Sequence, residues 1–226
     1  MRVAIVDCES TGVSQRDEAI AISATVLEVD AKGNTTRIAS WSGKQCPTVP
    51  IHPAAFRVHG MTRESLSGMT FDVAGLRATV ANVDCFIAHN AAFDARMLGK
   101  VAPSFLDAEW RCSYRQWVWP KLTNKKLDTV CQHFQVNRPV LHESAADVDA
   151  LIGVLLQRTG KTERSMTYLG KLLAAKPFSV RGQIETDQWR DRRRAAFAKS
   201  DAIKPTTVFW IVAVVLVVVL LYMQKH

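Results

Sequence analysis

Two carboxylates stand one residue apart at the end of an apolar segment near the start of the chain. Residues 3–9, VAIVDCE, begin with four apolar side chains and then include Asp7 and Glu9. The apolar run predicts a buried strand, and because successive side chains of a strand point to opposite faces, Asp7 and Glu9 share one face. Two like charges that close repel each other. The strand must therefore end in water, which weakens the repulsion, or beside a positive group such as a metal ion.

The order of the predicted elements indicates an α/β fold with a mixed sheet. Residues 19–29 and 35–42 predict two further strands, with the turn sequence KGN at 32–34 between them. In chain order, the next expected elements are a loop rich in His and Pro (51–62), a helix (72–82), a short strand (85–89) followed by a helix, and helices at 125–134, 144–158 and 162–175. Ser144 is the expected N-cap of its helix. Strands that alternate with helices are typical of α/β domains.

Two further acidic residues are expected near the first pair. The sequence HNAAFD at 89–94 places Asp94 in the first turn of a helix, where the helix dipole alone would also favour an acidic residue. Asp147 lies on the apolar side of the helix at 144–158, whereas Asp149 is expected to face solvent. An acidic side chain that faces a core needs a bound cation or a paired charge. We expect a cation, because no partner Lys or Arg is evident in the sequence.

Together, Asp7, Glu9, Asp94 and Asp147 offer the hard oxygen ligands that Mg²⁺ or Mn²⁺ prefers. Two such ions about 4 Å apart can stabilise both the attacking and the leaving oxygen of a phosphodiester. His142 is the candidate general base, because an unperturbed imidazole pKa near 6.5 suits proton transfer close to neutral pH. The residue types therefore indicate a two-metal phosphodiester hydrolase.

Three motifs resemble those of the DEDDh 3′→5′ exonucleases. DCESTG at 7–12 resembles the family's D-x-E-x-T-G, HNAAFD at 89–94 resembles its H-N-x-x-F-D, and HESAAD at 142–147 resembles its H-x-x-x-x-D. The segments 58–62 and 124–134 are similar to two secondary family segments. All three motifs occur in the family's order and spacing, on elements of the expected type.

The resemblance covers about residues 1–157 and implies a ribonuclease H-like exonuclease fold, with a mixed central sheet flanked by helices. It implies that Asp7 bridges two ions, that Glu9 and Asp147 complete one ion site, and that Asp94 holds the other ion. The residues that it places against the 3′-terminal nucleotide are Thr11, Val58, His59, Asn90 and Phe93.

Two positions depart from the family's pattern. Ala21 stands where the second strand of the family often carries a Glu, and Glu143 stands where an Arg commonly follows the His of the last motif. Neither position is a metal ligand, so the departures concern how substrate is held near that His. Cys8 points to the opposite strand face from the two carboxylates and is expected in the core.

The C-terminal part of the chain predicts a membrane anchor. Residues 206–223 include no charged side chain, and 18 residues at about 1.5 Å each span about 27 Å, enough for a bilayer core. Lys and Arg outnumber Asp and Glu by 12 to 5 over residues 158–204 but are equal in number over 1–157, so the basic excess directly precedes the apolar run. The positive-inside rule then places the catalytic domain in the cytoplasm. The basic segment either only sets this topology or also binds nucleic acid or lipid.

The expected protein is thus a single-pass, tail-anchored exonuclease. It has an exonuclease domain at 1–160, a basic juxtamembrane region with some helix at 161–205 and a transmembrane helix at 206–223. Its expected substrate is nucleic acid with a free 3′ end, DNA in preference to RNA, hydrolysed to nucleoside 5′-monophosphates. One alternative is an exoribonuclease of the same fold, because only contacts to the 2′-hydroxyl group separate the two substrates. Another is a catalytically inactive tether for nucleic acid at a membrane. Protein partners are not indicated.

Overall fold

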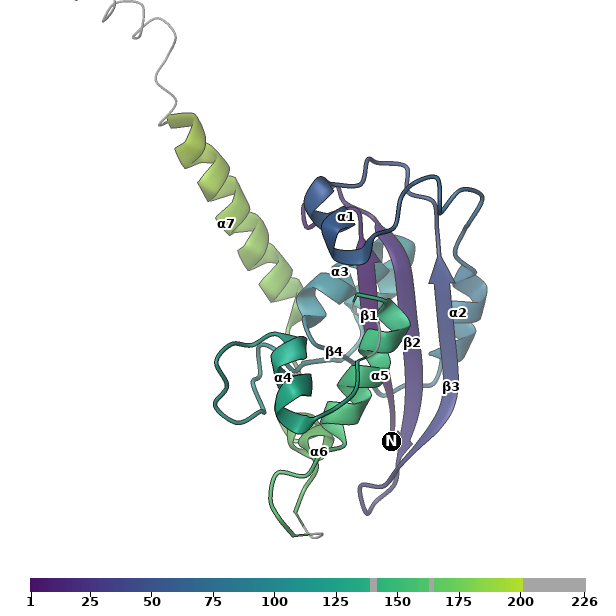
Figure 1. Cartoon of the computed structure of the whole chain (residues 1–226), viewed down its shortest axis with the longest axis vertical. Coiled ribbons are helices and arrows are strands. Elements are labelled where there is room, and N and C mark those ends of the chain that lie inside the picture. Colours follow the sequence, from purple (N-terminus) through teal and green to yellow (C-terminus); the bar gives the residue numbers. More distant parts are fainter. Residues whose placement is uncertain (139–141, 163–164, 201–226) are drawn as a thin grey trace, which may run out of the picture. The chain divides into compact units, whose positions relative to one another are not determined.

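A computed structural model of the chain describes residues 1–138, 142–162 and 165–200. The chain divides into two compact units, Met1–Ile184 and Glu185–His226. The first unit contains the sheet and the helices that cover it (Figure 1). Every site discussed below lies within that first unit.

Five strands form one mixed sheet in the order β3-β2-β1-β4-β5. The strands are β1 (Arg2–Ser10), β2 (Ala19–Val29), β3 (Thr35–Lys44), β4 (Cys85–Ala88) and β5 (Trp110–Cys112). β1, β2 and β3 pair antiparallel, whereas β4 pairs parallel with β1 and β5 pairs parallel with β4. The predicted α/β fold with a mixed sheet is therefore confirmed. The three residues of β5 are too few to show a strand pattern in the sequence.

Helices cover both faces of this sheet. They are α2 (Val73–Thr79), α3 (Ala91–Val101), the 3₁₀ helix η1 (Pro103–Leu106), α4 (Leu127–Phe134), α5 (Ser144–Leu155) and α6 (Tyr168–Leu173). Two further helices are α1 (Pro53–His59) and α7 (Val180–Ser200), which begins in the first unit and ends in the second. The buried side chains of α2, α3 and η1 join one core, and those of α4, α5 and α6 join a second core on the other face.

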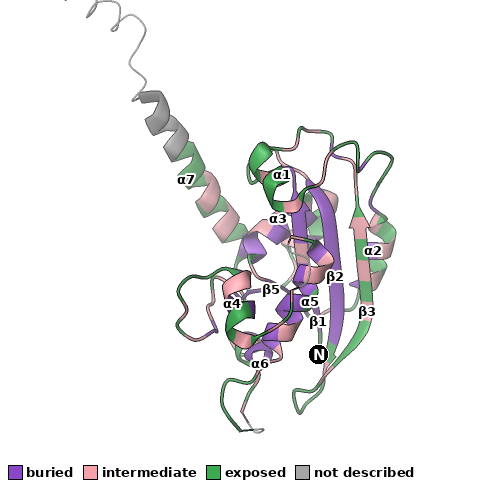
Figure 2. Cartoon of the chain, in the orientation of Figure 1, coloured by how far each residue is buried: buried purple, intermediate pink, exposed green. Residues whose placement is uncertain are grey.

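The central strand β1 builds both cores through its alternation. Ala4 and Val6 belong to the core with α3, together with Cys8, whereas Val3 and Ile5 belong to the core with α5. Figure 2 shows β1 and β2 buried along most of their length. Side chains two residues apart share a strand face, so the series that begins at Val3 continues into the two carboxylates on the α5 side. The expected burial of Cys8 in the core is confirmed.

The structure contains a helix, α1, where the sequence predicted only a loop. The ring nitrogen Nδ1 of His52 accepts a hydrogen bond from the Ala54 backbone N–H at 3.1 Å and caps the helix. Pro53 occupies its first turn, and Gly60 ends it with a φ of 67°. A proline at the start and a left-handed glycine just past the end are ordinary helix boundaries. The prediction was wrong because it took Pro and His as loop residues.

The N-cap of α5 also differs from the prediction. Ser144 is the first helical residue, and Glu143 precedes it as the cap. The Ser144 hydroxyl group instead lies 2.8 Å from that of Ser23 on β2, with which it shares a hydrogen bond. A buried hydroxyl group needs a partner, and here the neighbouring strand provides it. This bond fixes the first turn of α5 against the sheet.

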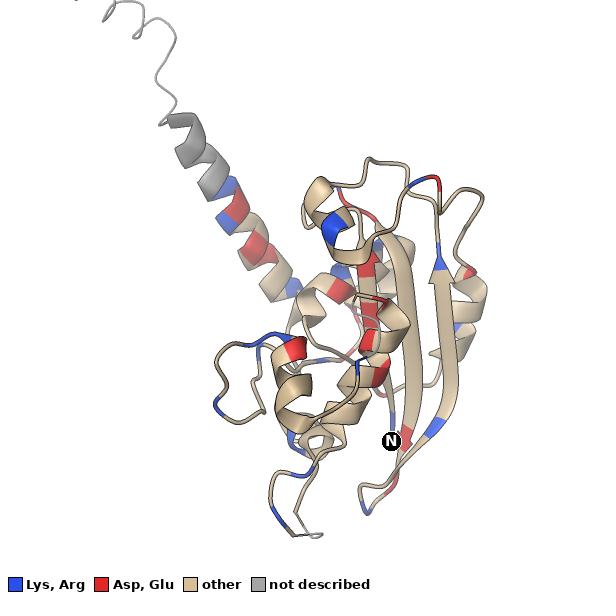
Figure 3. Ribbon diagram, viewed as in Figure 1, with Lys and Arg blue, Asp and Glu red and all other residues tan. Residues whose placement is uncertain are grey.

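The first compact unit extends past residue 160, the expected end of the exonuclease domain. Tyr168, Leu169 and Leu172 of α6 are buried in the core beneath α5. The helix α7 carries both basic and acidic side chains (Figure 3). Among the described residues, no helix combines the length and hydropathy needed to cross a membrane. The predicted span at 206–223 lies outside the described residues.

Candidate active site

Four carboxylates from three elements meet at the C-terminal end of β1. Asp7 and Glu9 extend from β1, Asp94 from the first turn of α3, and Asp147 from the first turn of α5. The exposed fractions are 8% for Glu9, 3% for Asp94 and 4% for Asp147. Acidic segments of β1 and α5 lie side by side in Figure 3. Asp149, two residues further along α5, is exposed, as predicted, and forms an ion pair with Arg37.

Burial and mutual repulsion raise the pKa values of carboxyl groups in this cluster. Burial, and next the charge of Asp147, raises the pKa of Asp7 from 3.8 to about 7. Burial, and next the charge of Asp7, raises the pKa of Glu9 from 4.5 to about 8. The pKa of Asp94 is also raised, first by burial and then by Asp7. In the absence of a metal ion, the cluster therefore retains protons near neutral pH.

The donor atoms of the cluster fit divalent cations. The buried Oδ1 of Asp94 has no hydrogen-bond partner among the described residues. Such an orphaned acceptor is unfavourable unless a ligand satisfies it. Glu9, His142 and Asp147 each offer a donor atom, and these atoms lie within 4.8 Å of one another. Carboxylate oxygens suit Mg²⁺ and Mn²⁺, and an imidazole can serve either as a ligand or as a base.

Arg138 pairs with Asp147, contrary to the expectation that the cluster has no Lys or Arg partner. Its Nε lies 2.6 Å from Asp147 Oδ1, and its Nη2 lies 2.6 Å from Oδ2. Both side chains are buried, with exposed fractions of 8% and 6%. The sequence did not reveal the pair because the partners stand nine positions apart and Arg138 precedes α5. No helical or strand periodicity relates the two positions.

His142 reaches the carboxylates from the segment before α5. Its backbone φ is 59°, in the left-handed region that residues other than Gly and Asn seldom adopt. Backbone strain of this kind persists where surrounding contacts impose it, and it is common at active sites. The partly exposed imidazole lies beside Glu9 and Asp147 and can therefore exchange protons with solvent.

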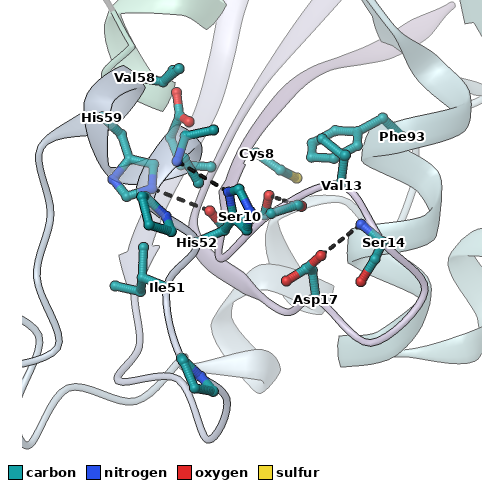
Figure 4. Close-up of a pocket in the computed structure, with 16 residues that line it drawn as sticks. Cys8, Ser10, Val13, Ser14, Asp17, Ile51, His52, Val58, His59 and Phe93 are labelled. Atoms are coloured by element: carbon teal, nitrogen blue, oxygen red, sulfur yellow. Dashed lines mark hydrogen bonds between the residues drawn. The ribbon is translucent and has the colours of Figure 1, made fainter. Parts of the chain in front are cut away.

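A cavity of about 720 Å³ adjoins Glu9 and is lined mainly by apolar side chains. Val58, His59 and Phe93, three of the residues predicted to contact the nucleotide, line it (Figure 4). His59 Nδ1 accepts a hydrogen bond from the Met61 N–H at 3.0 Å, so Nε2 carries the proton and donates to the Ser10 carbonyl at 3.2 Å. These two bonds fix the ring at the wall of the cavity.

Thr11 is placed differently from the other predicted contact residues. It is fully buried, and its hydroxyl group donates to Asp17 Oδ1 at 2.8 Å and accepts from the Glu18 N–H at 3.0 Å. The side chain therefore orders the loop that follows β1 and does not line the cavity. Asn90 precedes α3 and lines a second cavity, described below.

A protein-family model described as "Exonuclease" matches residues 4–155, which include all four carboxylates and His142. The chain belongs to the exonuclease family. A search of curated proteins found no match to the sequence.

Solved structures of exonuclease I resemble this chain in fold. The structure of E. coli exonuclease I in complex with a dT13 oligonucleotide has a TM-score of 0.55 and 16% identity, over 67% of this chain and 39% of that one. The zinc-ion-bound form of the E. coli exonuclease I–ssDNA complex has a TM-score of 0.54 with the same identity and coverage. The alignment thus spans about two fifths of the length of exonuclease I. At this identity the likeness shows the fold alone.

A second cavity of about 680 Å³ adjoins the carboxylate cluster on the side of His142. Val58 lines both cavities, and Asn90 and Arg138 line the second together with His142. Its remaining wall comes largely from the segment between β5 and α4, residues 113–126, which we call the β5–α4 loop. No functional role was predicted for this loop from the sequence, although SYRQWVWPKLTNKK combines four basic with three aromatic side chains and has no acidic one.

Proposed function

We propose that this exonuclease removes nucleotides from a free 3′ end by a metal-dependent mechanism and releases nucleoside 5′-monophosphates, with DNA as its main substrate. The observation that carries the proposal is the meeting of four carboxylates from three elements. Three of them, Glu9, Asp94 and Asp147, are buried, and Asp94 has an oxygen without a hydrogen-bond partner among the described residues. Exonuclease I, which shares the fold, has been solved with dT13 and dA16 oligonucleotides, which supports single-stranded DNA as the substrate of this chain.

Each residue of the site has a part in this proposal. Asp7 would be shared by two Mg²⁺ or Mn²⁺ ions, with Glu9 and Asp147 on one ion and Asp94 on the other. Bound there, the cations would stabilise negative charge on the attacking and leaving oxygens of the phosphodiester. His142 accepts the proton of the attacking water, because its imidazole lies beside the carboxylates and reaches solvent.

The residues predicted to contact the substrate have different places in the proposal. Val58, His59 and Phe93 line the apolar cavity beside Glu9, which suits a base and a sugar. Asn90 lies on the side of the second cavity. Thr11 acts through the loop after β1, since its hydroxyl group is bonded within that loop.

Digestion of matched oligonucleotides tests the proposed function. Single-stranded DNA and RNA of one sequence, labelled at the 5′ end, should be compared with MgCl₂ and with EDTA. We expect a ladder of DNA products shortened from the 3′ end, with no products in EDTA and none from the Asp7→Ala variant. Preferential shortening of RNA would favour an exoribonuclease. Binding without hydrolysis by the wild-type protein would favour an inactive tether.

The proposal includes a membrane anchor at 206–223 with the exonuclease domain on the cytoplasmic side. It is supported by the uncharged run, by Trp210 and Tyr222 near its ends and by the basic excess that precedes it. Membranes from cells that express the full chain should retain the protein through extraction with alkaline carbonate. Release of the protein by carbonate would contradict the anchor.

A further inference from the structure

The second cavity has a basic wall that the proposed chemistry does not use. Arg115, Lys125 and Lys126 of the β5–α4 loop line it, and His142 lies at its other side. All three basic residues are exposed. Among the described residues, no carboxylate forms an ion pair with any of the three. Their charges are therefore available to an anionic ligand.

Aromatic rings accompany these charges. The Lys125 ammonium group lies 5.7 Å from the centre of the Tyr114 ring and 5.2 Å from that of Trp117. The Arg115 guanidinium group lies 5.5 Å from the centre of the Tyr114 ring. Alternating cations and ring faces are the arrangement that holds single-stranded nucleic acid, because phosphates pair with the cations and unstacked bases stack on the rings.

His89 holds both ends of the β5–α4 loop. Its Nε2 lies 2.8 Å from the Lys125 carbonyl oxygen, which can only accept, so Nε2 carries the proton. Its Nδ1 then accepts a hydrogen bond from the Ser113 hydroxyl group at 2.8 Å. The His89 carbonyl oxygen also accepts from the Tyr114 N–H at 2.9 Å. The basic wall is therefore preorganised at a fixed place next to the strand that precedes α3.

We propose that the cavity between the β5–α4 loop and His142 binds the sugar-phosphate backbone and bases of a single strand immediately upstream of its 3′ terminus. The inference rests on the proposed function, because it takes the terminal nucleotide to lie in the cavity beside Glu9. Val58, which lines both cavities, marks where the strand passes from one to the other. Lys125 and Lys126 contact phosphates, and Tyr114 stacks with a base.

Binding measurements on the full chain test this path. The Lys125→Ala/Lys126→Ala variant should be compared with wild type for a 5′-fluorescein dT12 strand whose 3′-terminal linkage is a phosphorothioate. We expect Kd to rise at least tenfold near 100 mM salt. The slope of log Kd against log salt should decrease by about 1.4, since each single-strand phosphate contact contributes about 0.7. An rU12 strand should show the same loss, because both cations would contact phosphates rather than the 2′-hydroxyl group.

A matched variant separates local contacts from total charge. Lys32→Ala/Arg77→Ala removes two exposed positive charges from the β2–β3 turn and from α2, on the side of the sheet that β3 borders. Its Kd should stay within twofold of wild type. An equal loss in this variant, or no loss in Lys125→Ala/Lys126→Ala, would overturn the inference. So would an equal loss of affinity for a blunt duplex, because the inference requires unstacked bases.

Tyr114 provides a second, independent measurement. Tyr114→Leu should weaken dT12 binding about tenfold, whereas Tyr114→Phe, which keeps the ring, should bind within twofold of wild type. Equal affinities for the Leu and Phe variants would overturn the stacking role.

Hydrolysis by the wild-type protein distinguishes failure of the strand path from failure of the proposed function. If wild type shortens DNA but the variants bind normally, only the strand path fails; if wild type hydrolyses no nucleic acid, the proposed function fails.

Discussion

Arg138 supplies positive charge to the carboxylates in the metal-free protein. It forms two hydrogen bonds with Asp147 at 2.6 Å, and its Nη1 lies 4.0 Å from Asp128. The buried guanidinium group thus offsets part of the repulsion that raises the pKa values of Asp7 and Glu9. The charge balance of the metal-free cluster therefore depends on Arg138.

Removal of the Arg138 side chain should destabilise the metal-free protein. Arg138→Ala leaves buried Asp147 without its partner, which should cost about 3 kcal/mol in the free energy of unfolding. Urea denaturation in EDTA measures this loss, and MgCl₂ should reduce it because cations replace the lost charge. The matched control is Arg37→Ala, which breaks the exposed pair with Asp149 and should cost about 1 kcal/mol or less. Equal losses in the two variants would contradict the role of Arg138.

Glu9→Gln should change how stability depends on pH. The folded-state pKa of Glu9, about 8, lies above its unfolded value of 4.5. Its contribution is therefore fully present below pH 4.5 and is lost as pH rises through 8. Relative to wild type in EDTA, the Gln variant should gain thermal stability between pH 5 and pH 9. A difference in Tm that does not vary with pH would contradict the raised pKa.

His142→Asn should separate catalysis from folding. Asn tolerates the left-handed backbone that His142 adopts, so the Tm of the variant should remain within a few degrees of wild type. Turnover should fall by about 10²–10⁴-fold, since the variant lacks a proton acceptor at that position. The affinity for Mn²⁺, measured by calorimetry, should change little. A large loss of Mn²⁺ affinity would instead indicate that His142 is a metal ligand.

Among the helices and strands, the sequence predicts those with a regular hydrophobic pattern. It does not reveal those that depend on tertiary contacts. The strand at 19–29 was predicted with the bounds of β2, because a long β-branched apolar run is a strong signal. The placement of Asp94 and Asp147 in first helical turns also follows from local patterns. In contrast, α1 depends on a side-chain cap and β5 on its pairing with β4, so no period in the sequence marks them.

The β5–α4 loop should depend on His89 for its order. Burial lowers the pKa of His89 to about 4, so the ring is neutral at pH 7 and keeps one donor and one acceptor for its two bonds. His89→Ala removes both bonds. Trypsin should then cleave after the loop residues Arg115, Lys121, Lys125 and Lys126 about tenfold faster than in wild type. Mass spectrometry of the first fragments identifies the sites. Unchanged cleavage of the loop would show that its other bonds suffice.

For the whole molecule, the folding unit is longer than the segment that the family model matches. The match ends at residue 155, whereas α6 places Tyr168, Leu169 and Leu172 in the core beneath α5. Each of these side chains stabilises the fold by about 1.5–3 kcal/mol through burial. Their sum is comparable with the entire stability of a typical domain, about 5–15 kcal/mol.

A fragment of residues 1–160 should therefore fail to fold cooperatively. A fragment of residues 1–184, which contains α6, should show a single cooperative thermal transition by circular dichroism. The two fragments differ mainly in whether the core beneath α5 is covered. A cooperative transition of similar Tm in the shorter fragment would show that α6 is dispensable.

The position of the carboxylates on β1 bears on how this protein can change under selection. The same strand supplies apolar side chains to both cores and ends in residues whose charges repel one another. A variant library screened only for heat tolerance should therefore accumulate neutral residues at positions 7, 9 and 94. A library screened for nuclease activity should retain the acids there and acquire its stabilising changes elsewhere. Lineages that lose the need to cut nucleic acid would then become more robust by the replacement of a few side chains.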